Sequence, residues 1–415
     1  MDAPIQAVSL TRKPGGPLAP TAPFGLERAR TAQGFHASFP QYAPTPLASL
    51  NRLAAHLGVA AIHVKDESRR FSLNAFKVLG GSYAIGRYIA RELGLAPEDL
   101  TFSLLTSPHV RDRLGQLTFA AATDGNHGRG VAWTAAQLGH RSVVRMPKGS
   151  SPERLANIRA LGADASVTDL NYDDTVRLVQ QQAQEQGWVV IQDTAWEGYW
   201  DIPAWIMEGY TTMALEAVRQ LEDRPPTHLF LQAGVGAMAG SLAAFFADFY
   251  GQDRPKVVIV EPHRANCLFH TAQANDGQLH RVDGALDTIM AGLACGEPCS
   301  ISWDILRDHA DHFLSVPDYV AAQGMRVLGA PLPGDPQVIS GESGAATLGL
   351  VTEVLRRKDL APLKEDVYKR QVLSSFRLLL MLLTLPLVIC KGMKQKKQNV
   401  LLRQSNVKII GSLKD

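Results

Sequence analysis

The chain has 415 residues, 46% of them hydrophobic and 20% charged, and its formal net charge is +2. This length and composition allow one large hydrophobic core or two moderate ones. A net charge near zero gives no reason to expect a nucleic-acid partner. The first thirty residues are rich in proline and glycine and lack a continuous apolar core, so they predict no signal peptide.

Apolar strand patterns alternate with helical ones after a loop-rich arm, which is expected over residues 1–40. Strands are expected at 61–67, 117–122, 142–147, 165–168, 188–192, 228–231 and 257–262. Helices are expected at 48–57, 76–93, 131–139, 152–163, 173–185 and from 241. This alternation predicts an α/β fold with two open parallel-sheet domains, the smaller at about 80–190 and the larger over the rest of 41–365.

Lys77 lies in an apolar, glycine-flanked run, residues 72–81. A desolvated lysine loses part of its preference for the charged form, and its amine becomes nucleophilic near neutral pH. The run therefore suggests a lysine that forms a Schiff base with an aldehyde cofactor such as pyridoxal phosphate. The alternative is a lysine whose stem packs on apolar neighbours while its head stays in water.

Residues 123–130, TDGNHGRG, follow a predicted strand and precede a predicted helix. A polar, glycine-rich turn in this position lies at the carboxyl edge of a parallel sheet, where open α/β folds bind ligands. Asp124 or Asn126 as a simple helix cap is the alternative. Three glycines exceed what a cap requires, which favours a ligand-binding loop.

Residues 232–240, QAGVGAMAG, form a second glycine-rich connection from a strand to a helix. Glycines let backbone amides turn inward, and the dipole of the following helix favours an anion. The Lys-Ser/Thr of a nucleotide P-loop is missing. Close packing of small residues is the alternative, but together with Lys77 the loop suits the phosphate of pyridoxal 5'-phosphate.

Together the three motifs resemble the fold-type II pyridoxal-phosphate enzymes, which include threonine and serine dehydratases, cysteine synthase and the tryptophan synthase β chain. Within that group, the runs at 122–130, 192–199 and 288–296 resemble the diaminopropionate ammonia-lyases. The resemblance covers about residues 20–362. It implies a cofactor in the cleft between two domains, a small amino-acid substrate, no metal and a homodimer.

The resemblance also implies roles for individual residues. Lys77 would hold the cofactor and act as a base toward the substrate Cα, Asn126 would donate to the ring's phenolate oxygen, and Phe76 would contact the ring or merely pack. The phosphate is expected on the backbone of Gly234, Val235, Gly236, Ala237, Met238 and Gly240. Ser343 would face the pyridine nitrogen, with a helix-capping serine as the alternative.

Asp124 and Asp193 are the carboxylates that distinguish the subfamily by resemblance. A substrate with two ammonium groups gains from nearby carboxylates, and a carboxylate across the cofactor from Lys77 would take the proton of the opposite enantiomer. The alternative is that Asp124 caps the helix that follows it and that Asp193 caps the segment after the strand at 188–192. His127 is expected to be a packed loop histidine.

The four cysteines, Cys267, Cys295, Cys299 and Cys390, form no CxxC pair and no zinc-ligand spacing. Buried, isolated thiols are favoured, although a Cys267–Cys295 bridge near the substrate entrance stays open. A reducing, cytoplasmic setting is the default expectation.

The last fifty residues, 366–415, break the pattern. They hold ten Lys/Arg and two Asp/Glu, a net charge of about +8 that leaves about −6 for the rest. The apolar run Leu378–Cys390 is shorter than the roughly 20 residues that span a bilayer. A membrane-touching tail and a packed helix are alternatives, and a segment foreign to this fold is preferred.

The expected reaction is the α,β-elimination of D- and/or L-2,3-diaminopropionate to pyruvate and ammonia. A threonine/serine dehydratase is the enzyme alternative. A truncated or chimeric chain that binds cofactor without turnover is the non-enzyme alternative.

Overall fold

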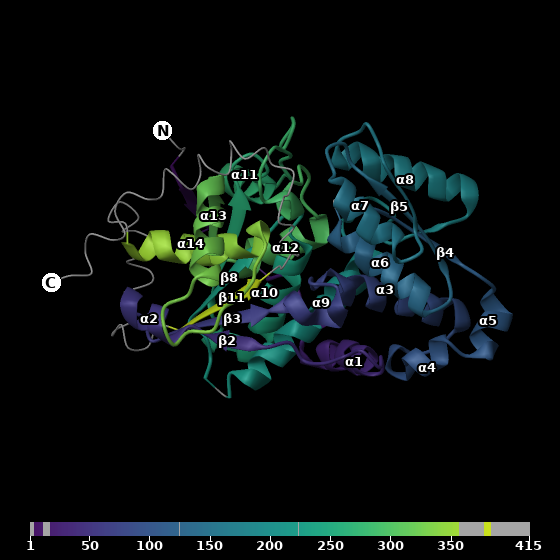
Figure 1. Ribbon diagram of the computed structural model, residues 1–415, viewed down its shortest axis with the longest axis horizontal. Coiled ribbons are helices and arrows are strands. Elements are labelled where there is room, and N and C mark those ends of the chain that lie inside the picture. The colour runs from purple at the N-terminus through teal and green to yellow at the C-terminus, as the bar shows by residue number, and fades with distance from the viewer. Residues whose placement is uncertain (1–3, 11–16, 124, 223, 357–376, 383–415) are drawn as a thin grey trace.

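The computed structural model describes residues 4–10, 17–123, 125–222, 224–356 and 377–382, the last six by their backbone alone. Two sheets organise the described chain, with helices packed around each (Figure 1). The larger sheet lies toward one end of the long axis and the smaller toward the other. Among the described helices, none is both long enough and apolar enough to cross a membrane.

The smaller sheet is entirely parallel. Its strands, in spatial order, are β6 (Asp164–Val167), β5 (Arg141–Met146), β4 (Thr118–Ala122) and β7 (Val189–Val190). The connections run through α6 (Asn126–Gln137), α7 (Pro152–Arg159) and α8 (Tyr172–Gln186). Two of these helices have side-chain caps, since Ser151 accepts from the Arg154 N–H and Asn171 from the Asp174 N–H.

The larger sheet has seven strands, parallel except at its two edges. Its order is β1 (Gln6–Ser9), β10 (His312–Val316), β9 (Lys256–Pro262), β8 (His228–Gln232), β11 (Arg377–Leu382), β3 (Ala61–Asp66) and β2 (Leu47–Ser49). Both edge strands, β1 and β2, pair antiparallel. The central strands are buried apolar runs, as expected of a parallel sheet covered on both faces.

Most of the remaining helices pack around the larger sheet or between the two sheets, whereas α4 (Phe102–Leu105) and α5 (Pro108–Leu114) lie toward the end that carries the smaller sheet (Figure 1). The others are α1 (Leu26–Ala37), α2 (Asn51–Leu57), α3 (Lys77–Leu93), α9 (Asp201–Gln220), α10 (Ala237–Tyr250), α11 (Cys267–Ala274), α12 (Ser300–His309), α13 (Asp318–Gly329) and α14 (Glu342–Arg356). Short 3-10 segments are η1 (Ala22–Phe24), η2 (Glu67–Ser72), η3 (Pro97–Asp99), η4 (Gly251–Asp253) and η5 (Ala291–Leu293).

Two expectations for the ends of the chain are wrong. The loop-rich arm expected over residues 1–40 contains α1, which buries Phe35 and packs against α9, and the edge strand β1. The tail expected to be foreign to this fold contributes residues 377–382 as β11, which pairs with both β3 and β8 at the centre of the sheet, so that expectation is wrong for these residues. A packed helix is therefore excluded for Leu378–Leu382, while the rest of the apolar run Leu378–Cys390 lies outside the described residues.

The two glycine-rich motifs are more helical than expected. α6 begins at Asn126 and α10 at Ala237, each several residues earlier than the sequence suggested. A Cβ on Gly130 would lie 2.8 Å from the Cα of Val78, and one on Gly128 would overlap the Thr123 methyl group. These two glycines therefore permit close helix packing, and a turn does not require them.

Candidate functional site

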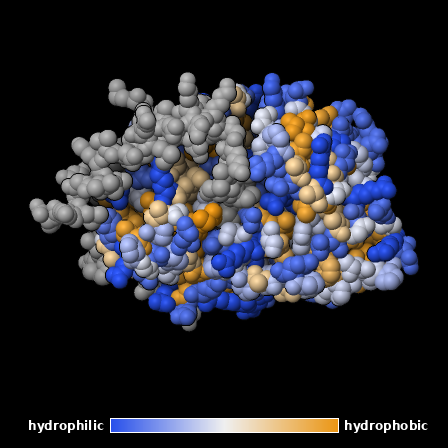
Figure 2. Space-filling view, viewed as in Figure 1, coloured by the Kyte–Doolittle hydropathy of each residue, from blue (hydrophilic) through white to orange (hydrophobic). Residues whose placement is uncertain are grey.

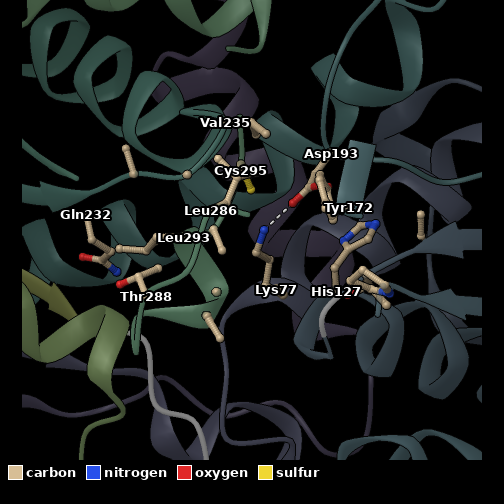
Figure 3. Close-up of a pocket in the computed structure, with 18 of the residues that line it drawn as sticks. Lys77, His127, Tyr172, Asp193, Gln232, Val235, Leu286, Thr288, Leu293 and Cys295 are labelled. Atoms are coloured by element: carbon tan, nitrogen blue, oxygen red, sulfur yellow. Dashed lines mark hydrogen bonds and ion pairs between the residues drawn. The ribbon is translucent and has the colours of Figure 1, made fainter. Parts of the chain in front are cut away.

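A cavity of about 270 Å³ lies where segments from the two sheets meet (Figure 3). One wall comes from the residues that follow β4, β5, β6 and β7, and includes His127, Tyr172 and Asp193. The other wall comes from the loop after β8 and from the segment 285–295. Apart from the segment 285–295, which follows α11, the residues that follow strands lie at the carboxyl ends of parallel strands, the usual place for a ligand in open α/β folds.

Lys77 projects into this cavity from the first turn of α3. That helix is fixed by close crossings, because a Cβ on Gly209 of α9 would overlap the carbonyl oxygen of Leu79. The Lys77 ammonium donates to the Asp193 carboxylate across the cavity, and the two side chains face each other in Figure 3. The Lys77 side chain is 21% exposed and that of Asp193 only 4%, so the pair lies at the inner end of an accessible space.

The charges of this pair stabilise each other. Burial alone lowers the pKa of Lys77, but the neighbouring Asp193 carboxylate more than offsets this effect and raises the pKa above its ordinary value. Burial likewise opposes ionisation of Asp193, yet Lys77 and, to a lesser degree, His127 lower its pKa to about 2. The expectation that desolvation dominates at Lys77 is therefore wrong in this structure, because the sequence did not show the counter-ion.

The loop after β8 offers a cradle for an anion. Residues 234–239 line the cavity, and Gly236, with φ of 98°, is the N-cap of the 14-residue helix α10. Unpaired backbone N–H groups and the positive end of the helix dipole therefore lie close to the cavity. The Gln232 amide, which also lines the cavity, is buried with no hydrogen-bond partner in the described structure. A phosphate-bearing cofactor fits this set of groups together with the Lys77 amine.

The other predicted residues divide into two sets. Phe76, Val235, Ala237 and Met238 line the cavity with Lys77 and Asp193, and the Phe76 ring also packs edge-to-face against Tyr210 at 4.9 Å. Among the described residues, the lining does not include Asn126, Gly240 and Ser343. Gly240 instead packs against α12, where a Cβ would lie 2.6 Å from Ser302 Oγ.

Asn126 and Ser343 are nevertheless buried, and each has a side-chain oxygen that makes no hydrogen bond within the described residues. Asn126 Oδ1 and Ser343 Oγ have no hydrogen-bond partner in the part of the chain described. Asn126 is the first residue of α6 and makes no side-chain cap, and the Ser343 hydroxyl caps nothing in α14, so the capping alternatives are not observed. Asp124 lies outside the described residues.

Sequence reasoning did not name Tyr172, Gln232 and Thr288 as site residues, although all three line the cavity. Gln232 and Thr288 lie within the runs already identified at 232–240 and 288–296, and Tyr172 directly precedes the helix expected at 173–185. Cys295, considered only for a bridge near the substrate entrance, also lines the cavity. Cys267 and Cys295 both lie beside Gly234 and are not joined by a disulfide. In the described chain, no three His, Cys, Asp or Glu side chains gather as metal ligands would.

Residues 39–367 match the family model described as "Pyridoxal-phosphate dependent enzyme". The chain belongs to this family. It is 53% identical over 334 residues to the diaminopropionate ammonia-lyase of Salmonella typhimurium (strain LT2), covering 79% of this chain and 83% of that one. It is 52% identical over 334 residues to the Escherichia coli K12 enzyme of the same name, covering 80% of this chain and 82% of that one.

Solved structures agree with the sequence comparison. The crystal structure of the Escherichia coli diaminopropionate ammonia-lyase in complex with D-serine matches with a TM-score of 0.82 and 45% identity, over 92% of this chain and 94% of that chain. The predicted fold-type II α/β class and the resemblance to the diaminopropionate ammonia-lyases are both confirmed.

Proposed function

We propose that this chain is a pyridoxal-phosphate-dependent ammonia-lyase that eliminates ammonia from 2,3-diaminopropionate and yields pyruvate after hydrolysis. The observation that carries the proposal is the Lys77–Asp193 pair, set in a cavity beside the glycine loop in a chain more than half identical to two ammonia-lyases. Pyridoxal phosphate, when bound, supplies the electron sink for removal of the Cα proton.

The residues of the chain divide the remaining tasks. The backbone of Gly234, Val235, Gly236, Ala237 and Met238 holds the phosphate at the start of α10. Lys77 would hold the cofactor through its amine. Once this amine is free again, it would take the substrate's Cα proton from the face that Lys77 faces. Phe76 forms the wall beside the ring. By resemblance, Asn126 is proposed at the phenolate oxygen and Ser343 at the pyridine nitrogen, and their spare polar atoms are consistent with such partners.

Asp193 is proposed to bind the substrate's ammonium group. Its side chain is almost completely buried, and it pairs with the only cation that contacts it among the described residues. A buried carboxylate stays charged only with a partner, because desolvation otherwise favours the protonated form. When the Lys77 amine is occupied with the cofactor, an ammonium group of the substrate replaces it as the counter-ion.

Asp124 is proposed as the base for the opposite enantiomer, on the resemblance alone. Asp124→Asn keeps the side-chain shape but cannot accept a proton, and loss of a general base costs about 10²–10⁴ in rate. We expect that loss for D-diaminopropionate and a much smaller one for the L form. An equal, small loss for both enantiomers contradicts this role.

A coupled assay tests the function. Pyruvate release, followed with lactate dehydrogenase and NADH, is measured for D- and L-diaminopropionate, L-serine and L-threonine, together with the visible absorbance of bound cofactor. Turnover of diaminopropionate supports the proposal. Turnover restricted to serine or threonine supports the dehydratase, and bound cofactor without turnover supports the non-enzyme alternative.

The cellular form is also a proposal. We expect a cytoplasmic homodimer with its cofactor between the two domains, by resemblance to the family. On the coloured part of the face shown in Figure 2, apolar areas are small and separated by polar ones. Light scattering during gel filtration gives the mass of the particle, and a monomeric mass contradicts the homodimer.

A further inference from the structure

The strand that leads to Asp193 leaves its sheet early. β7 pairs with β4 through Val189 and Val190, and the Ile191 N–H still donates to Ala120 O at 2.8 Å. A regular parallel ladder would next join the Ala122 N–H to Ile191 O. In this structure Ile191 O instead accepts a hydrogen bond from His127 Nε2 at 2.7 Å.

The side chain of Gln192 replaces the lost backbone bond. Its Oε1 accepts the Ala122 N–H at 3.0 Å, and its Nε2 donates to Ala122 O at 3.0 Å and to the Tyr172 hydroxyl at 2.8 Å. Gln192 is completely buried. The amide of Gln192, the residue directly before Asp193, thus connects the end of β4 to the start of α8.

Exchanging a backbone bond for a side-chain bond brings little stability, because the side chain must also be ordered. What changes is the direction of the chain. Freed from the ladder after Ile191, the backbone turns so that Asp193 faces Lys77. Departures from regular local structure of this kind are expected at functional sites.

We propose that Gln192, assisted by His127, is a positioning residue that fixes the Asp193 carboxylate opposite Lys77 without touching the reacting atoms. The inference rests on the proposed function of Asp193. A buried amide bonded to two elements leaves the next residue little freedom. A misplacement of about 1 Å is enough to cost about 10²-fold in rate.

A double-mutant cycle tests whether Gln192 acts through Asp193. We expect Gln192→Leu to lower kcat/KM for diaminopropionate by about 10²-fold in the parent chain, but by less than about threefold in the Asp193→Asn background. Gln220→Leu is the matched control, since Gln220 also bonds a backbone carbonyl, that of Thr45, but away from the cavity. Equal losses in both backgrounds, or an equal loss for Gln220→Leu, overturn the proposal.

A second readout does not depend on turnover. The rate at which the cofactor-free protein incorporates pyridoxal phosphate is measured against pH, because only the neutral Lys77 amine reacts. Displacing Asp193 removes the counter-ion that keeps this amine protonated, so the profile moves to lower pH. We expect Gln192→Leu to move it in the same direction as Asp193→Asn, by about one pH unit, which is tenfold in neutral amine.

Gln192→Met is a second variant in case Gln192→Leu does not fold, because it keeps the length of the side chain without adding a charge. Its thioether cannot donate to Ala122 O and is only a weak acceptor for the Ala122 N–H. It is expected to move the incorporation profile as Gln192→Leu does. A profile unchanged in both variants overturns the proposal. If the parent chain does not turn over diaminopropionate, the proposed function fails, while the incorporation profile still tests the positioning of Asp193.

Discussion

Two buried ionic clusters in this molecule have opposite relations to the space around them. Glu216 of α9 accepts from Arg70 at 2.8 Å, from Lys65 at 2.7 Å and from the Tyr42 hydroxyl at 2.8 Å. The Thr45 N–H adds a further bond at 3.1 Å, and Arg70 also pairs with Glu67. Asp193, by contrast, pairs with Lys77 as its one contacting cation in the described part of the chain, and it faces a cavity.

This difference indicates that the Glu216 cluster is structural, whereas the partner of Asp193 can be exchanged for a ligand. Burial disfavours the charge of Glu216, but the hydrogen bonds and charges of Arg70 and Lys65 hold its pKa well below the ordinary value. With its acceptor sites occupied by Arg70, Lys65, Tyr42 and Thr45, Glu216 has little capacity for a ligand. Asp193 can accept further hydrogen bonds, and its partner Lys77 is partly exposed in the cavity. A ligand can therefore replace Lys77 as the partner of Asp193.

The largest expected effect is at Lys77. Lys77→Ala removes the cofactor's anchor and a proton-transfer group whose loss alone costs about 10²–10⁴ in rate, so we expect elimination to fall below detection. The borohydride-reducible adduct with pyridoxal phosphate should disappear as well, as measured by mass spectrometry. Lys256→Ala, at a lysine paired with Asp311 on the larger sheet, is the control. Normal turnover and a retained adduct in Lys77→Ala refute the assignment.

Glu216→Gln tests the structural side of the comparison. Removing one partner of a buried ion pair leaves uncompensated charge, here on Lys65 and Arg70, and typically costs about 3–5 kcal/mol. We expect a lower urea midpoint, followed by circular dichroism, with kcat of the folded protein little changed. A large loss of kcat at unchanged stability instead places Glu216 in the catalytic machinery.

Asp193→Asn tests the exchangeable side. We expect kcat/KM to fall by about 10²-fold for both enantiomers, since a charge-assisted bond to the substrate is lost in a desolvated site. The same change lowers the pKa of Lys77 and should speed cofactor incorporation near neutral pH. Slower incorporation, or a loss confined to one enantiomer, argues against the proposed role.

Glu261 provides the smallest and most specific test, because its carboxyl is buried without a contacting cation in the described structure. It accepts the N–H groups of Leu268 and Phe269, at 2.9 and 2.7 Å, and burial raises its pKa to about 8. The folded state therefore holds a proton that the unfolded state releases near pH 4.5. Its stabilising contribution is full below that pH and is lost as the pH rises through about 8.

Glu261→Gln keeps an acceptor oxygen and removes the titration. We expect the melting temperature of the variant to fall less than that of the parent as the pH rises from about 5 to about 8. Parallel melting curves for the two proteins across this range contradict the raised pKa.

Local sequence patterns predicted most of the α/β alternation and the three cofactor motifs. Lys77 and the loop after β8 were identified because an apolar lysine and a strand–glycine–helix junction have recognisable local signatures, whereas Asp193 was identified only by the resemblance to the family. The same patterns did not predict how far each helix extends toward its glycines. Gly130 fits against Val78 only because α3 and α6 cross there, and that crossing is a tertiary contact.

What the sequence determined by itself is the set of chemical groups and the class of fold, since both follow from local periodicity and residue type. Tertiary structure alone decided which groups meet. Lys77 and Asp193 are 116 residues apart, and their pairing reverses the effect that burial by itself has on the lysine. The central place of β11 and the diversion of the ladder at Gln192 also depend on partners distant in the chain. A sequence pattern shows how a segment folds locally, but the charge and direction of a side chain depend on the neighbours that packing brings to it.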